Sequence, residues 1–283
     1  MFDCHSHVQF AAFEKDWKEV IDRSLRAGVS MINVGTQRDT SAKAIEVAHQ
    51  YEKGVYAAVG LHPVHTRRSY HDAQEIGGAD EEGFHSRAEE FDLNLYKKMA
   101  ADPKVVAIGE CGLDYYRLTE SPEEILAIKA KQREVFIGHV RVAEATGKAL
   151  MLHCRPSRGT DDAYEDLLQV LRELEFPTDR CVLHFYVGSA VMTKKFLDAG
   201  FNFEFGGVTT FTTDYDEQLK MVPLNCITLE TDSPYVAPAP YRGQRNEPAY
   251  VVEVAKKLAQ IKGVSYDEVE RQTDANVKRI FGI

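Results

Sequence analysis

The stretch ALMLHCRPSRGTDDAYEDLLQVLRELEFPTDRCVLH, residues 149–184, contains an apolar run, an amphipathic stretch and a second apolar run. The runs Ala149–Leu152 and Arg180–Leu183 have the length and composition of buried strands. Between them, Asp161–Leu174 has the apolar spacing of a helix that packs one face on a core. A strand, a helix and a second strand in this order form a βαβ unit with parallel strands.

The same alternation extends along the whole chain. Six more apolar, β-rich runs occur, at Met1–Cys4, Val29–Val34, Val55–Leu61, Val105–Ile108, Phe201–Phe205 and Cys226–Leu229. Amphipathic stretches separate most of them, at Lys15–Ala27, Thr40–Glu52, Glu123–Thr146 and Ala190–Ala199. Eight strands are the number in a closed parallel barrel. Because no Pro-, Ser- or Gly-rich linker divides the 283 residues, we predict one α/β domain over residues 1–283. Its fold is a (β/α)8 TIM barrel with the active site at the C-terminal ends of the strands.

The composition argues against several classes of protein. Lys and Arg number 34 and Asp and Glu number 44, and the net charge of −10 disfavours a basic surface that coats nucleic acid. The chain has no run of about 18 apolar residues, and its start, MFDCHSHVQF, does not resemble a signal peptide. The five cysteines are scattered and form no CxxC pair, which suits reduced thiols. We therefore expect a cytoplasmic protein with no membrane segment.

One connection departs from the regular alternation. The charged segment Arg67–Glu90, with Gly77-Gly78 inside it, lengthens the connection after the third predicted strand. Loops of this length are either functional lids or surface decoration. The sequence leaves both possibilities open for this segment.

The first predicted strand carries a possible metal-chelating pair. Asp3, His5 and His7 occupy alternate positions, so the two-residue period of a strand places them on one face. Neutral imidazole is a common ligand of zinc-like ions. An HxH pair alone is more often incidental than ligating, so the prediction depends on other ligands close by.

Further residues of ligand type follow four other predicted strands. Glu110 ends VVAIGE, His153 ends ALMLH, His184 ends CVLH and Asp232 ends ITLETD. In a parallel barrel these strand ends open onto one face, where catalytic groups gather. Any one of these residues is better explained as a hydrogen-bonded buried histidine or a helix-capping acid. Their occurrence at five strand ends together predicts a common site.

This set of side chains is larger than one ion requires. A tetrahedral ion takes four ligands, and this set contains four histidines and two carboxylates. The surplus predicts two divalent ions with a bridging carboxylate. Glu110, from the middle of the strand order, is the natural bridge. The mixed nitrogen and oxygen set suits Zn²⁺, Mn²⁺ or Co²⁺ better than Mg²⁺, but the sequence does not identify the ion. Paired ions activate a shared water, so the predicted chemistry is hydrolytic.

Eight segments give a specific resemblance to a known family. They are FDCHSH (2–7), GLHP (60–63), AIGECGLDYYR (107–117), LHCR (152–155), VLHFYVG (182–188), LETDSPY (229–235), RGQRNEP (242–248) and NVKRIF (276–281). In this order, and across essentially the whole chain, they resemble the motifs of the TatD family of metal-dependent DNases. IGECGLDYY and LETDSPY are the most specific of them.

The resemblance implies a TIM-barrel hydrolase that cuts phosphodiester bonds in DNA. The ligands it implies are His5, His7 and Asp232 for the first ion, His153 and His184 for the second, and Glu110 as the bridge. These residues are the ones that the strand ends also indicate. Glu110 and Asp232 are therefore the expected catalytic residues, since a carboxylate at position 232 can both ligate and accept a proton from water.

Three residues are candidates for substrate binding. His62, in GLHP, matches a family position near the substrate phosphate, although a packed histidine next to Pro63 explains it equally well. Arg117 and Arg155 follow strand ends and can hold phosphate with a planar guanidinium group, or form surface ion pairs. Asp3 and Asp114 are candidates for orienting the ligands, or are structural caps and turn acceptors.

The chain also departs from the family pattern. It has Val8-Gln9 where the family often has an acid after HxH, and Pro156-Ser157 where an acid often follows the LHxR arginine. Neither position is a proposed ligand. The segment Arg67–Glu90 has no obvious family counterpart, so the metal chemistry is better defined than the substrate.

Three functions remain open at this point. The first is a two-metal deoxyribonuclease, exonucleolytic on single-stranded or short DNA ends, because an acidic protein has few cations for a long duplex footprint. The second is a related barrel hydrolase of a small phosphoester or amide, although binuclear amidohydrolases often use a modified lysine where this chain has Glu110. The third is a metal-stabilised interaction protein without catalysis.

Overall fold

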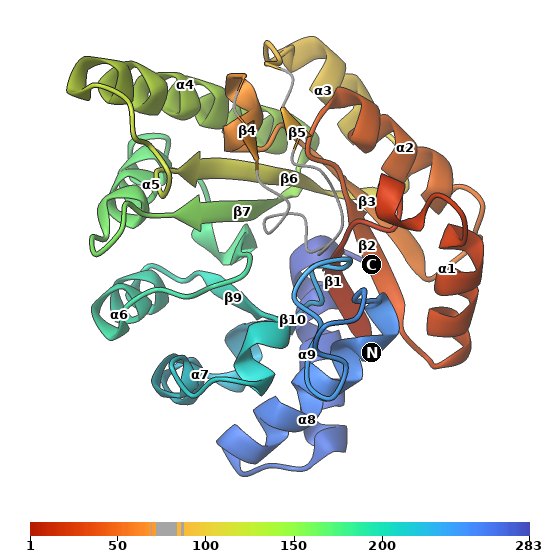
Figure 1. Cartoon of the computed structure of the whole chain (residues 1–283). Helices are drawn as coiled ribbons and strands as arrows, with labels where there is room; N and C mark the ends of the chain where they lie inside the picture. The colour runs from red at the N-terminus through yellow and green to blue at the C-terminus, as the bar shows by residue number, and fades with distance from the viewer. Residues whose placement is uncertain (69, 72–83, 86–87) are drawn as a thin grey trace.

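The computed structural model describes residues 1–68, 70–71, 84–85 and 88–283. It contains an eight-stranded parallel sheet in the order β1-β2-β3-β6-β7-β8-β9-β10, which curls into a nearly closed barrel (Figure 1). The strands are β1 (Phe2–Ser6), β2 (Ser30–Val34), β3 (Val55–Val59), β6 (Val105–Asp114), β7 (Ala149–Arg155), β8 (Cys181–Leu183), β9 (Asn202–Phe205) and β10 (Ile227–Leu229). The predicted TIM-barrel fold is therefore confirmed.

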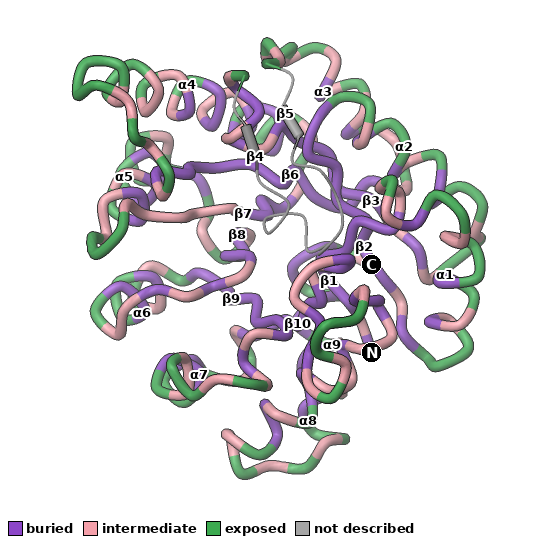
Figure 2. The backbone as a smooth tube through the Cα atoms, viewed as in Figure 1, coloured by how far each residue is buried: buried purple, intermediate pink, exposed green. Residues whose placement is uncertain are grey.

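Helices surround the barrel and expose their outer faces, while the strands are buried (Figure 2). They are α1 (Trp17–Arg26), α2 (Arg38–Ala48), α3 (Leu93–Ala100), α4 (Pro122–Thr146), α5 (Asp162–Glu173), α6 (Ala190–Asp198), α7 (Asp216–Met221), α8 (Val251–Lys262) and α9 (Tyr266–Phe281). The longest, α4, begins with a capping box between Ser121 and Glu124 and ends at Gly147, which has the left-handed conformation common after a helix. Within the described ranges, no helix is long and apolar enough to cross a membrane.

The interior of the barrel forms a core layer beneath the carboxyl ends of the strands. Met151 and Val182 belong to this buried cluster, and each lies two residues before a histidine on the same strand face. Helix α9 adds Ile280 and Phe281 to the same cluster. The carboxyl-terminal helix therefore closes the amino end of the barrel and leaves the opposite end for the site.

Several elements differ from the sequence-based expectation. Strand β6 continues to Asp114, six residues beyond the predicted end at Ile108, because it remains paired with β7 past an irregularity. Helices α3, α7, α8 and α9 were not among the predicted helical stretches. Most of the segment Arg67–Glu90 lies outside the described residues; two short strands, β4 (Tyr70–His71) and β5 (Phe84–His85), pair antiparallel.

A polar contact closes the barrel between its first and last strands. β1 and the residues after β10 share only an isolated bridge, Ser6 with Ser233. Beside it, the backbone N–H of Thr231 donates to Asp3 Oδ1 at 2.8 Å and its hydroxyl donates to Asp3 Oδ2 at 2.6 Å. Both side chains are fully buried. Asp3 therefore links β1 to the residues after β10, and we call this junction the seam of the barrel.

We predict that Thr231→Val destabilises the protein by roughly 1–3 kcal/mol, because the change leaves a buried Asp3 oxygen without its donor. Urea denaturation followed by circular dichroism measures this effect. Thr213→Val, at an exposed position, is the matched control and is expected to change stability by less than about 0.5 kcal/mol. Equal stability of the two variants would show that the Asp3–Thr231 contact does not hold the seam.

Candidate active site

Glu110 lies at the centre of the site, and its two oxygens face different groups of side chains. On one side, Glu110 Oε2 is 3.4 Å from His5 Nε2 and 4.0 Å from His7 Nε2. Asp232 Oδ1 completes this group, 3.3 Å from His7 Nε2 and 3.9 Å from His5 Nε2. The structure therefore brings together the three residues that the sequence suggested for a first ion.

On the other side, Glu110 Oε1 faces three imidazoles. It is 2.9 Å from His153 Nδ1, 3.3 Å from His62 Nε2 and 3.6 Å from His184 Nε2. His153 and His184 are the residues suggested for a second ion. His62, which we expected to contact substrate, lies close enough to His153 and Glu110 to serve as a ligand as well.

An irregular stretch of β6 places Glu110 in this position. The register between β6 and β7 shifts between Ile108 and Cys111, on either side of Glu110. Gly112 follows with φ +139°, and a Cβ there would lie 2.0 Å from the carbonyl oxygen of His153. Only glycine fits this close approach of the two strands. Bulges of this kind often redirect side chains next to active sites.

Hydrogen bonds fix the orientation of two of the histidine rings. His7 donates from Nδ1 to the carbonyl of Val34 at 2.7 Å, which leaves a lone pair on Nε2 toward Asp232 and Glu110. His184 donates from Nδ1 to Glu230 Oε2 at 2.5 Å, which likewise turns Nε2 toward Glu110. Metal-ligating histidines commonly have such a partner on the other ring nitrogen.

His153 is held between two carboxylates. Its Nδ1 faces Glu110 and its Nε2 lies 2.9 Å from Asp114 Oδ2. Burial alone would lower the pKa of His153, but Asp114 and Glu110 outweigh burial and raise it to about 9. Burial would raise the pKa of Asp114, but the hydrogen bond from His153 dominates and lowers it to about 2. Asp114 therefore orients His153, one of the two possibilities that the sequence left open.

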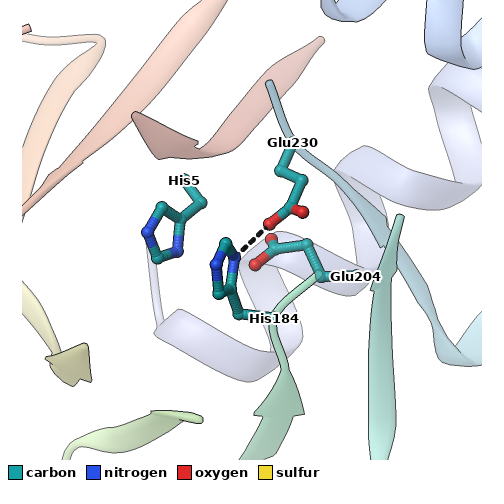
Figure 3. Close-up of side chains that lie close together, drawn as sticks. All are labelled: His5, His184, Glu204 and Glu230. Atoms are coloured by element: carbon teal, nitrogen blue, oxygen red, sulfur yellow. Dashed lines mark hydrogen bonds and ion pairs between the residues drawn. The ribbon is translucent and has the colours of Figure 1, made fainter. Parts of the chain in front are cut away.

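Two fully buried carboxylates lie beneath His5 and His184. Glu204, on β9, and Glu230, after β10, face the two stacked imidazoles in the barrel interior (Figure 3). Burial, together with the mutual repulsion of neighbouring carboxylates, raises the pKa of both groups well above the usual range. A Cβ at Gly206 would lie 3.0 Å from Glu230 Oε1, so the glycine leaves room for this carboxylate.

Glu204 and Glu230 were not predicted from the sequence as site residues. Glu230 precedes Asp232 by two residues in LETD, and this spacing places the two side chains on one face of an extended chain. The spacing could therefore have predicted Glu230 as a site residue. Glu204 stands between two phenylalanines of a buried strand, NFEF, where a charged residue is rare unless it has a role.

The donor set fits divalent cations. The Nε2 atoms of His5 and His7 lie only 3.2 Å apart, and the lone pair of His7 points into the same space. Burial, followed by the charge of His184, lowers the pKa of His5 to about 3, so this imidazole is neutral. The lone pairs of neutral imidazoles and the negative charges of ionised carboxylates repel one another when they converge in a buried space. A cation between them removes this repulsion and is bound by both kinds of group. Three groups of these side chains lie close enough together to hold a cation: His5 with His7 and Asp232; His62 with Glu110 and His153; and His5 with His184, Glu204 and Glu230.

Charge within the site keeps the central carboxylates ionised. Burial favours neutral Glu110, but His62 and His184, with further imidazoles, lower its pKa well below the usual range. Burial likewise favours neutral Asp232, but the imidazoles of His7, His184 and His5 outweigh burial and lower its pKa below the usual value. Both side chains are therefore negative near neutral pH.

The two candidate arginines lie at the rim of the site. Arg155 is the last residue of β7, and its guanidinium carbon is 3.8 Å from the ring centre of Tyr116. Arg117 follows Tyr116 and is exposed. Neither is among the residues in contact with Glu110, which agrees with a position farther out on the same face.

Comparison with known proteins places the chain in a family. The family model for the TatD related DNase matches residues 2–282. The metal-dependent hydrolase YabD of Bacillus subtilis strain 168 is 34% identical over 286 residues, which cover 100% of this chain and 99% of that protein. The 3′-5′ ssDNA/RNA exonuclease TatD of Klebsiella pneumoniae strain 342 is 32% identical over 294 residues, with 100% and 98% coverage.

A solved structure has the same fold. YJJV, a TatD homolog from Escherichia coli K12, superposes with a TM-score of 0.79 and 24% identity, over 100% of this chain and 98% of that one. Together, these comparisons define a metal-dependent hydrolase. The chain belongs to the TatD-related DNase family, as the resemblance of its motifs indicated.

We predict that Glu230 fixes the tautomer of His184. ¹⁵N NMR of protein freed of metal by chelation is expected to show His184 protonated at Nδ1 in the wild type and in Glu230→Gln, whose amide oxygen still accepts a hydrogen bond. Glu230→Leu removes the acceptor and is expected to give a mixture of tautomers. The exposed Glu217→Leu is the control. An unchanged His184 spectrum in Glu230→Leu would contradict the orienting role.

Proposed function

We propose that the protein is a two-metal deoxyribonuclease that cleaves phosphodiester bonds at single-stranded or short DNA ends. The observation that carries the proposal is the position of Glu110, whose two oxygens face separate groups of imidazoles. A carboxylate in this position suits a bridge between two ions. His5, His7 and Asp232 would hold the first ion, and His153 and His184 the second.

Two bound ions would supply an activated water and would stabilise negative charge on the attacked phosphate. Asp232 is the proposed proton acceptor. Its side chain is 16% exposed, against 6% for Glu110, so Asp232 is the more open of the two carboxylates to water from the mouth of the site. Its lowered pKa keeps it ionised and able to take a proton at Oδ.

The remaining side chains position the substrate and the ligands. His62, at the mouth of the site beside Glu110, and Arg155 and Arg117, at the rim, are the proposed contacts for the phosphate and its neighbours. His62 also lies within ligand distance of the second group, so metal and phosphate binding are both available to it. Asp114 and Glu230 hold His153 and His184 in place.

The choice of nucleic acid as substrate rests on the family and on relatives named as 3′-5′ ssDNA/RNA exonucleases. The net charge of −10 favours a short or single-stranded end over a long duplex.

We also propose that the protein acts in the cytoplasm, since all five cysteines are free thiols in the structure. Hydrolysis of a small phosphoester or amide at the same centre is the alternative function.

Removal of metal is expected to abolish hydrolysis of single-stranded DNA, and return of Zn²⁺, Mn²⁺, Co²⁺ or Mg²⁺ is expected to restore it for at least one ion. The physical reason is that the site offers no Ser or Cys nucleophile beside a base. Assays on single-stranded DNA, duplex DNA and a small phosphodiester, paired with elemental analysis, measure this. Full activity in excess chelator with no bound metal would refute the metal mechanism. Turnover of the small ester alone would favour the alternative function.

Asp232→Asn is expected to keep much of the bound metal and to lose turnover by about 10²- to 10⁴-fold. An amide oxygen can still coordinate, but the amide nitrogen cannot accept a proton. Asp214→Asn, at an exposed position, is the control. The measurements are kcat on single-stranded DNA and metal content per chain. Near-normal kcat with full metal content would exclude Asp232 as the base.

A further inference from the structure

Two arginine-aromatic pairs flank the site on its open face. In one, Arg155 stacks on Tyr116 with 3.8 Å between guanidinium carbon and ring centre, and Arg158 lies 5.7 Å from the same ring. In the other, Arg242 stacks on Phe211 at 3.7 Å. We propose that these pairs are two stacking platforms for unpaired bases of a single nucleic-acid strand that crosses the mouth of the barrel. The inference rests on the proposed function and adds the binding path of its substrate.

The first platform is attached directly to the site. The backbone N–H of Tyr116 donates to Asp114 Oδ1 at 3.0 Å, and the other oxygen of Asp114 contacts His153. Arg155 lies two residues after His153 on β7. A base on Tyr116 would therefore be next to the nucleotide whose phosphate reaches Glu110.

The second platform lies on the other side of the opening. Phe211 follows the short helix η4 (Gly207–Thr210) after β9, and Arg242 lies in the loop after β10. The backbone N–H of Ala239 donates to Thr210 Oγ1 at 2.8 Å, which joins the two segments. Tyr116 follows β6 and Phe211 follows β9, and these strands are three places apart in the eight-strand order, so the two rings lie at separate points around the metal-binding groups.

The exposure of Phe211 supports a binding role. Its side chain is 40% exposed, and it is the only aromatic residue among the large exposed hydrophobic side chains of the described residues. Tyr116 is also partly exposed. A base would stack on the face of each ring opposite the guanidinium group, since every base has a π-face.

The charges of the arginines support phosphate as the second partner. Arg155, Arg158 and Arg242 form no salt bridge with any residue that the structure describes, although the protein has ten more acidic than basic residues. By contrast, Arg23 and Arg245 pair with Asp16 and Glu247. Guanidinium groups kept apart from carboxylates in an acidic protein remain available for phosphate.

A single strand fits these features better than a duplex. Bases in a duplex are already stacked and paired, so isolated rings at the mouth have no free base face to bind. Three arginines also provide few phosphate contacts, whereas duplex binding gains affinity from many. The platforms therefore select unpaired nucleotides on both sides of the reacting phosphate.

Tyr116→Ala and Phe211→Ala test the proposal. Each is expected to raise the Kd of metal-free protein for a fluorescent oligothymidylate by about 5- to 100-fold, the loss expected for one stacked base. Tyr116→Phe keeps the ring and is expected to bind nearly as wild type. In the holoenzyme, the ratio of kcat/KM for the oligonucleotide to that for a small base-free phosphodiester is expected to fall.

Tyr56→Ala is the matched control, because Tyr56 has Lys104 Nζ 5.9 Å from its ring and lies near the amino end of β3, away from the site. Unchanged Kd in both platform variants would overturn the inference, as would an equal loss for duplex and single strand. If the wild type binds oligothymidylate through these rings but does not cleave it with metal, the platforms stand and the proposed function fails.

Discussion

The site depends on one buried carboxylate that faces imidazoles on both sides. Glu110 is buried, and its charge is compensated by His5 on one side and by His62, His153 and His184 on the other. Burial of such a charge is costly unless partners compensate it. The histidines that converge on this group from several strand ends therefore compensate its charge and, together with it, could hold cations.

The barrel supports this arrangement from below. The interior cluster and α9 fill the amino end, and Asp3 closes the seam next to Asp232. Between core and site lie Glu204 and Glu230, two acids in a region that would ordinarily be apolar. Glu230 forms the hydrogen bond that orients His184, and Glu204 lies beside Glu230 under the stacked rings of His5 and His184. The same layer of side chains therefore orients a ligand and fills the interior of the barrel.

The sequence predicted the barrel and the residues that meet in the site because both follow from local patterns. Apolar runs give strands, and the parallel arrangement brings residues such as His153 and His184 to one face. The irregular course of β6 around Glu110 could not be predicted, since it depends on the close approach of Gly112 to β7. The role of Glu204 was also hidden, because its partner Glu230 is 26 positions away and comes close only when β9 and β10 pair.

The central claim is that Glu110 bridges two divalent ions. The most direct measurement is anomalous X-ray diffraction from crystals of the protein grown with Mn²⁺ or Zn²⁺. The account predicts two peaks about 3.5–4 Å apart, one beside each oxygen of Glu110, with His5 and His7 at the first and His153 and His184 at the second. A single peak, or two peaks that Glu110 does not contact, would contradict it.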